Sequence, residues 1–532
     1  MSSANHTSTV FAAAGAAAAG VNDHWPAIVA SSVFIAFTLI AQYFFKVDPL
    51  AGIPVVGQGG KASRRRQFVK QGGAWRLHHE GYQKFKDGLF RIITARETES
   101  IIISPKFLGE LRKLPDDVLS FNASVTESLQ SKYTGVKADL PHVTETVKTS
   151  LTPALPRLNP EIHSEVVDSM RLELPQSSTW TDINLNSKLL RIVAMASGRI
   201  FVGPELCRDE GYLDAAINYT IDLMIAVHVV AFMPVWLRPI LGPIIPPVRK
   251  VHRRVKEADE FLRPVVTARR EAEKLPGYKK PDDMLQWIMN SQDKFGVKDD
   301  KELAFNQLGV SFAAIHTTTM TTTNSLYTLA AMPEIAPMLR EDVQQALAAS
   351  DGVFTSLAMQ NMKKLDSFLR EVLRYYPIST TSFQRKVLKP FTLSNGTTIP
   401  AGIIIEIPAA GVSGDPSIFP DPEVFDALRF YKLRQSKSKA ESGAKAAETV
   451  ANSQFVSVSA SSLTFGYGKH ACPGRFFAAN EIKMILATIL LHYDIKLPDG
   501  VTERYPNLEM GAQSMPDPKK LISIRKREDT AP

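Results

Sequence analysis

The residue best suited to do chemistry is Cys472, in the glycine-rich run Phe465-Gly466-Tyr467-Gly468-Lys469-His470-Ala471-Cys472-Pro473-Gly474. Its glycines let the backbone approach a flat ligand closely. Apolar residues with helical spacing follow (478, 482, 485, 486 and 489), so Cys472 is expected at a helix N-terminus, with Pro473 in the first turn. There the helix dipole and nearby N–H groups stabilise a thiolate, and an anionic sulfur bound to iron favours O–O bond cleavage. The alternative is a buried free cysteine, the usual role of a lone cysteine.

Two other segments carry reactive or charged side chains at informative spacing. Glu371 and Arg374 are three residues apart and share one helix face, although such a pair taken alone is usually solvated. The stretch Ala313–Thr318 places His316 beside Thr317 within a predicted helix of about 302–330. Without other context, this threonine-rich stretch would be a poor helix interior.

The elements around these residues form a mainly α pattern with minor β. The pattern is mostly helical from about 138 to 350. β-branched runs at 91–94 and 100–104 predict a hairpin, and Asn395-Gly396 predicts another within 391–407. Residues 435–460 are rich in Ser, Ala and Lys, which predicts a solvated surface insertion.

An uncharged apolar segment precedes this body. Residues 25–45 are 21 residues without a charge, close to the ~20 that a helix needs to cross a bilayer. Asp23 precedes them and basic residues follow, so the N-terminus is expected outside the cytosol and the body inside. A cleaved signal peptide is the alternative, but the segment is too long and has no basic n-region. The predicted organisation is a luminal tail (1–24) with a glycosylation sequon at Asn5, a transmembrane anchor (25–45), a Pro/Gly hinge (46–60) and a catalytic domain (61–532).

Composition excludes several classes of protein. The 532 residues are 44% hydrophobic, ample for a large core, and only two are cysteines, Cys207 and Cys472. Two cysteines exclude a disulfide framework and a zinc site of several thiolates. The net charge of +8 is spread through helical segments without a recognisable nucleic-acid motif, so no nucleic-acid partner is expected.

A second apolar segment, residues 223–248, is interrupted by Arg238 and several prolines. These interruptions disfavour a second membrane span. They favour a surface loop that dips into the bilayer, with a buried core segment as the alternative.

After the hinge, nearly the whole chain resembles the cytochrome P450 family. The family's heme-loop pattern is Phe, two residues, Gly, three residues, Cys, one residue and Gly. It falls without a gap on Phe465, Gly468, Cys472 and Gly474. The resemblance implies the cytochrome P450 fold and heme b as cofactor, with the Cys472 thiolate as the axial ligand of the iron.

The resemblance also implies roles for residues outside that pattern. His470 and Arg385 match positions that pair with heme propionates. Glu371 and Arg374 match the family's Glu-x-x-Arg motif, and Arg429 matches the arginine that completes this buried structural triad. The match around Arg429 is looser, because the family usually has proline at position 427 and this chain has alanine.

Thr317 falls on the family's distal-helix threonine, which guides protons during oxygen activation. Two positions depart from the family pattern, since Ala314 replaces a glycine and His316 replaces an acidic residue. Because histidine can shuttle protons at neutral pH, His316 is expected to assist Thr317.

Three segments resemble fungal members of the family, namely Ile315–Thr318, His470–Arg475 and Ser197–Gly203. Such members often decorate terpenoid or other secondary-metabolite scaffolds. The implied protein is a monooxygenase of the endoplasmic reticulum membrane that hydroxylates or multiply oxidises a lipophilic terpenoid or meroterpenoid, using O2. Its electrons would come from an NADPH–cytochrome P450 reductase, with cytochrome b5 as an optional second donor.

A basic surface around the heme loop is expected to receive the reductase, with Lys469, Arg475 and Lys483 as candidates. Two alternatives stay open, a heme sensor without oxygenase activity and a heme-thiolate isomerase or dehydratase that needs no reductase. Thr317 disfavours both. Substrate contacts are expected from variable loops at about 119–135, 223–248, 378–383 and 511–516.

Overall fold

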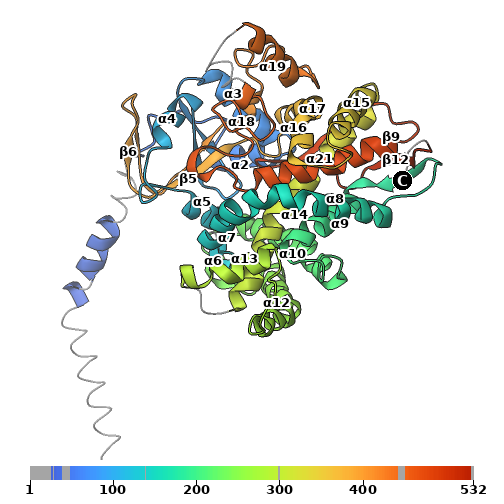
Figure 1. Ribbon diagram of the computed structural model, residues 1–532. Helices are drawn as coiled ribbons and strands as arrows, with labels where there is room; N and C mark the ends of the chain where they lie inside the picture. Colours follow the sequence, from blue (N-terminus) through green and yellow to red (C-terminus); the bar gives the residue numbers. More distant parts are fainter. Residues whose placement is uncertain are drawn as a thin grey trace, which may run out of the picture. The chain divides into compact units, whose positions relative to one another are not determined.

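The computed structural model describes residues 25–27, 29–38, 48–137, 139–296, 300–440 and 450–528 (Figure 1). The chain divides into two units, Met1–Ile53 and Pro54–Pro532. In the first unit, helical residues run from Trp25 to Thr38, over the first part of the predicted anchor. The rest of that anchor, the predicted luminal tail and its Asn5 sequon lie outside the described residues.

The second unit is mainly helical, as predicted. Its helices are α2 (Lys61–Val69), α3 (Gly73–Lys84), α4 (Leu108–Leu111), α5 (Phe121–Ser128), α6 (Ser131–Thr134), α7 (Pro141–Thr146), α8 (Thr152–Glu173), α9 (Leu185–Phe201), α10 (Glu210–Phe232), α11 (Arg238–Leu241), α12 (Pro246–Ala272), α13 (Met284–Ser291), α14 (Lys301–Ala331), α15 (Ile335–Ala348), α16 (Ser356–Asn361), α17 (Lys363–Tyr375), α18 (Ala409–Ser413), α19 (Arg429–Ala440) and α21 (Arg475–His492).

The strands form small sheets. They are β1 (Leu89–Ile93), β2 (Glu99–Ile103), β3 (Leu119–Ser120), β4 (Thr181–Asn184), β5 (Ser382–Val387), β6 (Phe391–Thr392), β7 (Thr398–Ile399), β8 (Ile404–Ile407), β9 (Tyr493–Lys496), β10 (Asn507–Met510), β11 (Gln513–Pro516) and β12 (Leu521–Lys526). The largest sheet has the order β1-β2-β8-β5-β3, and a second has the order β4-β12-β9.

Both predicted hairpins are confirmed. β1 and β2 pair antiparallel, with Leu89 opposite Ile103. β6 and β7 pair across the turn at Asn395-Gly396, where Gly396 has a φ of 84° and the Asn395 side chain accepts a hydrogen bond from the Thr397 N–H group. The positive φ explains the glycine, because residues with a side chain rarely adopt it.

The central helix of the second unit is α14, which contacts α9, α10, α12, α17 and α21 (Figure 1). It confirms the helix predicted at about 302–330. Several of its buried hydroxyls donate to carbonyl groups one turn earlier, for example Thr321 to Thr317 and Thr322 to Thr318, both at 2.9 Å. These bonds help a threonine-rich segment to form a helix interior, because they give part of the buried hydroxyls a partner within the helix. The buried hydroxyls of Thr319 and Thr323 have no hydrogen-bond partner in the described part of the chain.

The apolar segment 223–248 divides between the two alternatives, since its first part lies in a core helix and the part around 235–244 is exposed, as expected for a surface loop. Its first ten residues belong to α10, and the remainder contains α11 and the start of α12. Among the described residues, α10 alone is long and apolar enough to cross a membrane, but more than half of its apolar window is buried against other helices. It is therefore a core helix with one exposed apolar face. Sequence reasoning missed the helix because it weighted the prolines, which lie beyond Met233.

The predicted surface insertion at 435–460 is wrong for its last third. The backbone carbonyl groups of Asn452 and Gln454 accept hydrogen bonds from Arg370 of α17. Phe455 is buried, and its N–H group donates to Asp366 at 3.0 Å. Long-range partners on α17 thus bury a segment whose composition is typical of solvated loops.

The predicted hinge, residues 46–60, is also partly attached to the second unit. The Arg91 N–H group of β1 donates to the Pro54 carbonyl, and the Val56 N–H group donates to the Arg91 carbonyl. From Pro54 onward, the segment therefore runs along the sheet.

Candidate active site

An apolar cavity of about 390 Å³ lies between α14, the start of α21 and the loop that carries Cys472. α14 contributes Ala313, Ala314 and Thr317, and the loop contributes Phe465 and Cys472. A Cβ atom built on Gly474, another lining residue, would meet nothing within 4 Å. The wall beside Cys472 is thus open enough for a flat ligand to lie against the backbone.

The loop holds Cys472 by its backbone. The Cys472 N–H group donates to the Phe465 carbonyl at 2.8 Å, and Gly466 and Gly468 have φ values of 78° and 69°. α21 begins at Arg475 with Gly474 as its N-cap, so Pro473 lies before the helix rather than in its first turn. The sulfur still precedes a helix N-terminus.

Opposing effects act on the Cys472 thiol. Burial raises its pKa, whereas the N–H groups of Gly474 and Arg475 and the charge of Arg475 lower it. The Arg475 guanidinium also donates to the Cys472 carbonyl at 2.9 Å. Since burial has the largest effect, the protein alone favours the thiol, and a cation at the sulfur is needed to complete the thiolate.

Thr317 lies on the cavity side of α14. Its hydroxyl donates to the Ala313 carbonyl at 2.8 Å and approaches the Ala314 carbonyl at 3.3 Å. With its hydrogen held by the helix, the oxygen can accept a hydrogen bond from a molecule in the cavity.

His316, by contrast, is not among the residues that line the cavity. Its Nε2 atom lies 2.8 Å from the Ile217 carbonyl oxygen of α10. The structure therefore does not bring the histidine ring to the cavity beside Thr317.

A small pocket beside the loop gathers basic side chains, with Arg112, Arg385 and His470 among its lining residues. Arg385 is buried, which lowers its pKa to about 10, and its guanidinium lies over the Phe383 ring at 4.2 Å. Among the described residues, no carboxylate forms an ion pair with Arg385, so its buried charge favours binding of an anion. Sequence reasoning missed Arg112, whose Cβ approaches Gly468 although the two are distant in sequence.

His470 faces the same pocket and is held from two sides. Its Nε2 atom is 3.1 Å from Asp116, and its ring stacks on Phe121 with centroids 5.1 Å apart. Burial lowers the pKa of His470, while its hydrogen bond to Asp116 raises it.

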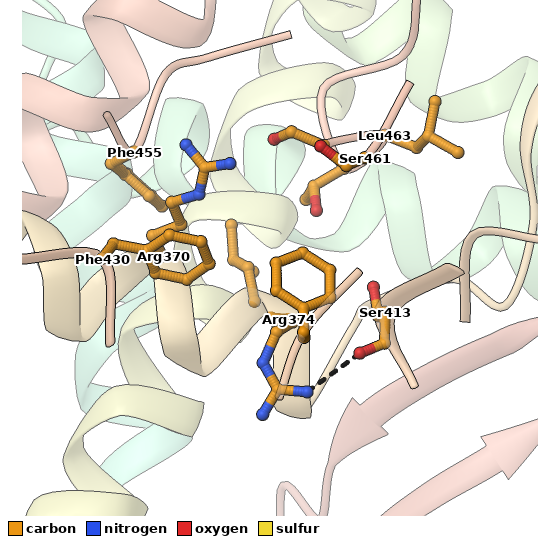
Figure 2. Close-up of a pocket in the computed structure, with 11 residues that line it drawn as sticks. Arg370, Arg374, Ser413, Phe430, Phe455, Ser461 and Leu463 are labelled. Atoms are coloured by element: carbon orange, nitrogen blue, oxygen red, sulfur yellow. Dashed lines mark hydrogen bonds between the residues drawn. The ribbon is translucent and has the colours of Figure 1, made fainter. Parts of the chain in front are cut away.

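Glu371, Arg374 and Arg429 meet in the interior. The Arg374 guanidinium makes two hydrogen bonds of 2.8 Å to the fully buried Glu371 carboxylate, and Arg429 Nε approaches the same carboxylate at 3.1 Å. Arg374 also donates to the Ser413 carbonyl at 2.9 Å, drawn as a dashed line in Figure 2. These bonds tie α17 to the segments at 413–429.

Arg370 extends this set of contacts toward the Cys472 loop. Figure 2 shows Arg370 and Arg374 in one small cavity with Phe430, Phe455 and the segment Ser461–Leu463, which leads into the loop. The Arg370 guanidinium lies 4.2 Å from the Phe430 ring centroid. Sequence reasoning missed Arg370, and its spacing of one helical turn before Arg374 was the available signal.

Lys483 is buried, which contradicts its predicted place in the docking surface for the reductase. Its ammonium lies 2.7 Å from Asp366 and 3.0 Å from the Met359 carbonyl, and its side chain is 8% exposed. A buried lysine with these partners cannot form part of a docking surface, whereas the side chain of Lys469 is half exposed.

Sequence reasoning also missed a buried carboxyl group next to Thr318. Glu481 of α21 is fully buried and accepts a hydrogen bond of 2.7 Å from Ser197. Burial raises its pKa to about 8, although Ser197 and the nearby Thr318 hydroxyl favour the charged form. Thr318 itself lines the cavity.

The comparisons with known proteins agree with this geometry. The family model for Cytochrome P450 matches residues 79–523. The cytochrome P450 monooxygenase ATR3 of Stachybotrys chlorohalonatus is 40% identical over 433 residues, which cover 81% of this chain and 90% of the relative. The monooxygenase AN1598 of Emericella nidulans is 37% identical, covering 86% and 84%, and braC of Annulohypoxylon truncatum is 33% identical, covering 94% and 98%.

The chain therefore belongs to the cytochrome P450 family. It is an oxidoreductase of the monooxygenase type whose cofactor is heme b with an axial cysteine thiolate. Monooxygenases of this family act on small molecules and receive electrons from a redox partner.

The residues at the cavity fit that cofactor. The apolar walls suit a porphyrin, and a cysteine lies at one side. The buried Arg385, which has no carboxylate ion-pair partner within the described part of the chain, lines the neighbouring pocket and offers positive charge to the acidic groups of a porphyrin.

Proposed function

We propose that this chain oxidises a lipophilic terpenoid or meroterpenoid scaffold by one or more hydroxylations. The observation that carries the proposal is the apolar cavity that Cys472 and Thr317 both line. A cavity with apolar walls and a few hydroxyl groups favours a large hydrocarbon scaffold with little charge. The resemblance to fungal members that act on terpenoids narrows the class further.

Each residue has a distinct part in this proposal. Heme b, when bound, supplies the iron at which O2 is activated. Cys472 would be the axial ligand, Arg385 and Arg112 would supply positive charge for the propionates, and His470 would be a hydrogen-bonding partner for them. Thr317 holds a water molecule from which a proton is delivered, as general acid catalysis requires.

Glu371, Arg374 and Arg429 have a structural part. Their hydrogen bonds fix the segments on either side of α17, so that the Cys472 loop keeps its shape. The glycines at 466 and 468 provide the positive φ values that this loop needs.

Electrons are proposed to come from an NADPH–cytochrome P450 reductase, with cytochrome b5 as an optional donor. Lys469 is the best candidate for its docking surface, since its side chain is half exposed next to the Cys472 loop, where its ammonium pairs with the exposed Asp116 at 3.0 Å. Arg475 is less available because its guanidinium is bonded to the Cys472 carbonyl.

Attachment to the endoplasmic reticulum membrane is part of the proposal, with residues 25–45 as anchor, 46–60 as connection and 61–532 in the cytosol. The exposed apolar side chains of α10 and its following loop support a second contact with lipid; they are Ile221, Ile225, Val229, Phe232, Val235, Trp236, Ile240 and Ile244. Arg65 of the basic helix α2 lies 5.2 Å from the Phe232 ring centroid, so positive charge borders this patch. Basic residues beside an apolar patch favour an anionic membrane surface.

The test is reconstitution of the full chain in microsomes with a fungal reductase, NADPH and a panel of terpenoid and meroterpenoid scaffolds. We expect scaffold-dependent NADPH consumption and a product that carries one oxygen atom from isotopically labelled O2 for each hydroxylation. Turnover without the reductase, giving a product without labelled oxygen, would instead identify a heme-thiolate isomerase or dehydratase.

A further inference from the structure

His316 immediately precedes Thr317 on α14, yet its ring contacts α10. Because the Ile217 carbonyl can only accept, the His316 Nε2 atom at 2.8 Å must donate its hydrogen to this contact. Successive residues of an α-helix point about 100° apart. One residue can therefore face the cavity while its neighbour faces α10.

The surroundings of the ring keep it neutral. Burial lowers the pKa of His316, and the hydrogen bond to Ile217 only partly offsets this effect. A neutral ring has one N–H group, and here that group is engaged with a backbone carbonyl.

Ile217 is a firm anchor for this bond, because α10 is capped at its own N-terminus and is paired with α12 beyond Ile217. At its N-terminus, the Asp209 carboxylate accepts a hydrogen bond of 2.9 Å from the Tyr212 N–H group. Five residues after Ile217, the buried Asp222 pairs with Lys250 at 2.8 Å and Arg254 at 3.0 Å of α12.

We propose that His316 is a positioning residue whose hydrogen bond to Ile217 fixes the rotation of α14 at the level of Thr317. This contact fixes where the Thr317 hydroxyl lies in the cavity. Placement matters because a catalytic group displaced by about 1 Å can lose roughly 10²-fold in rate. This positioning role differs from the proton relay that the sequence predicted for His316. The proposal depends on heme binding but not on the identity of the substrate.

The test compares His316→Leu with His316→Gln in the full-length, heme-loaded protein. A glutamine amide can donate to the Ile217 carbonyl but cannot titrate, so it preserves the contact and removes any relay. One measurement is the infrared C–O stretch of the reduced carbon monoxide complex, which responds to polar groups near the bound gas. The other is amide hydrogen exchange of peptides covering 213–221 and 313–321.

We expect His316→Leu to shift or broaden the C–O band and to speed exchange in both peptides several-fold, and His316→Gln to restore both. Met320→Leu, one turn along α14, is the matched control and should change neither. The proposal would be overturned if His316→Leu had the C–O band and the amide exchange rates of the native protein. It would also be overturned if His316→Leu and His316→Gln changed both measurements equally. Thr317→Val shows how far the C–O band shifts when the hydroxyl itself is removed. If this variant shifts nothing, the catalytic role proposed for Thr317 is wrong. Amide hydrogen exchange in His316→Leu still tests the contact between His316 and Ile217.

Discussion

The two cysteines, Cys207 and Cys472, lie in different environments. Cys207 is buried, its sulfur lies 3.8 Å from the Pro204 carbonyl, and burial raises its pKa to about 11. Cys472 lines the cavity beside the N–H groups of Gly474 and Arg475. Only Cys472 therefore has the setting of a metal ligand.

Replacing Cys472 by Ala is expected to abolish the red-shifted Soret band of the reduced carbon monoxide complex, because that band requires a thiolate ligand. Cys207→Ala is the matched control and should keep the band. The measurement is the carbon monoxide difference spectrum of both variants. A persistent band in Cys472→Ala would refute the assignment.

Thr317→Ala should keep heme and NADPH consumption but lower the product formed per NADPH. A positioned general acid or base contributes roughly 10²–10⁴-fold to the rate of a proton-transfer step. Because a water molecule in the cavity can replace part of this contribution, we expect the ratio of product to NADPH to fall about tenfold. The missing electrons should appear as hydrogen peroxide. Thr317→Ser keeps the hydroxyl and should retain most of the product, whereas equal ratios in all three proteins would mean that protons arrive by another route.

Glu481 predicts a pH dependence of stability. Its folded-state pKa is raised from 4.5 to about 8, so within this window the folded chain holds a proton that the unfolded chain lacks. The free energy of unfolding should therefore fall as pH rises through the window, by at most ~1.4 kcal/mol per pH unit. Glu481→Gln should remove this slope and be more stable than the native chain near pH 8. Urea unfolding at several pH values tests this, with Ser197→Ala, which retains the acid, as the variant that should keep the slope.

At the scale of elements, α17 connects otherwise separate segments. Asp366, Arg370, Glu371 and Arg374 lie on one helix and reach segments between residues 413 and 455. None of these partners is close in sequence. The helix therefore holds together segments that precede the Cys472 loop, which is the basis of the structural role proposed for it.

Glu371→Ala or Arg374→Ala should prevent stable heme incorporation. Glu371→Ala leaves the Arg374 and Arg429 guanidinium groups without their shared carboxylate, and Arg374→Ala leaves Glu371 with Arg429 as its remaining partner. Breaking a buried ion pair costs about 3–5 kcal/mol. The heme-to-protein ratio after purification is the measurement, and Lys363→Ala, on an exposed position of the same helix, should give the native ratio. Full heme content with merely slow turnover would contradict the structural role.

The sequence predicted those parts of the fold that depend on local patterns. The spacing of Phe465, Gly468, Cys472 and Gly474 specified the loop, and Asn395-Gly396 specified a turn. Lys483 was predicted wrongly because its burial depends on Asp366, more than a hundred residues away. The direction of the His316 ring likewise depends on Ile217, which no local pattern indicates.

At the scale of the whole molecule, Pro54–Pro532 forms a unit whose apolar patch is fully contained within it. A chain lacking residues 1–53 should therefore keep heme and still bind anionic vesicles. In the same background, Val235→Ser, Trp236→Ser and Ile240→Ser combined should abolish that binding, since each exposed side chain contributes roughly 1.5–3 kcal/mol when buried in lipid. Vesicle co-sedimentation measures both. If the truncated chain stays in the supernatant at low salt, the patch does not bind membranes.

The supports of the Cys472 loop also constrain the order of biogenesis. Ser382 donates to the Leu463 carbonyl at 2.7 Å, and Arg370 and Glu371 reach segments that are translated 50 to 90 residues after them. Closing contacts between such distant segments is slow compared with forming a helix. While the ribosome is still translating the loop, α14 and α17 have already been synthesised, but the chain has no complete wall against which a porphyrin could rest. Heme capture is then confined to the final stage of synthesis or later.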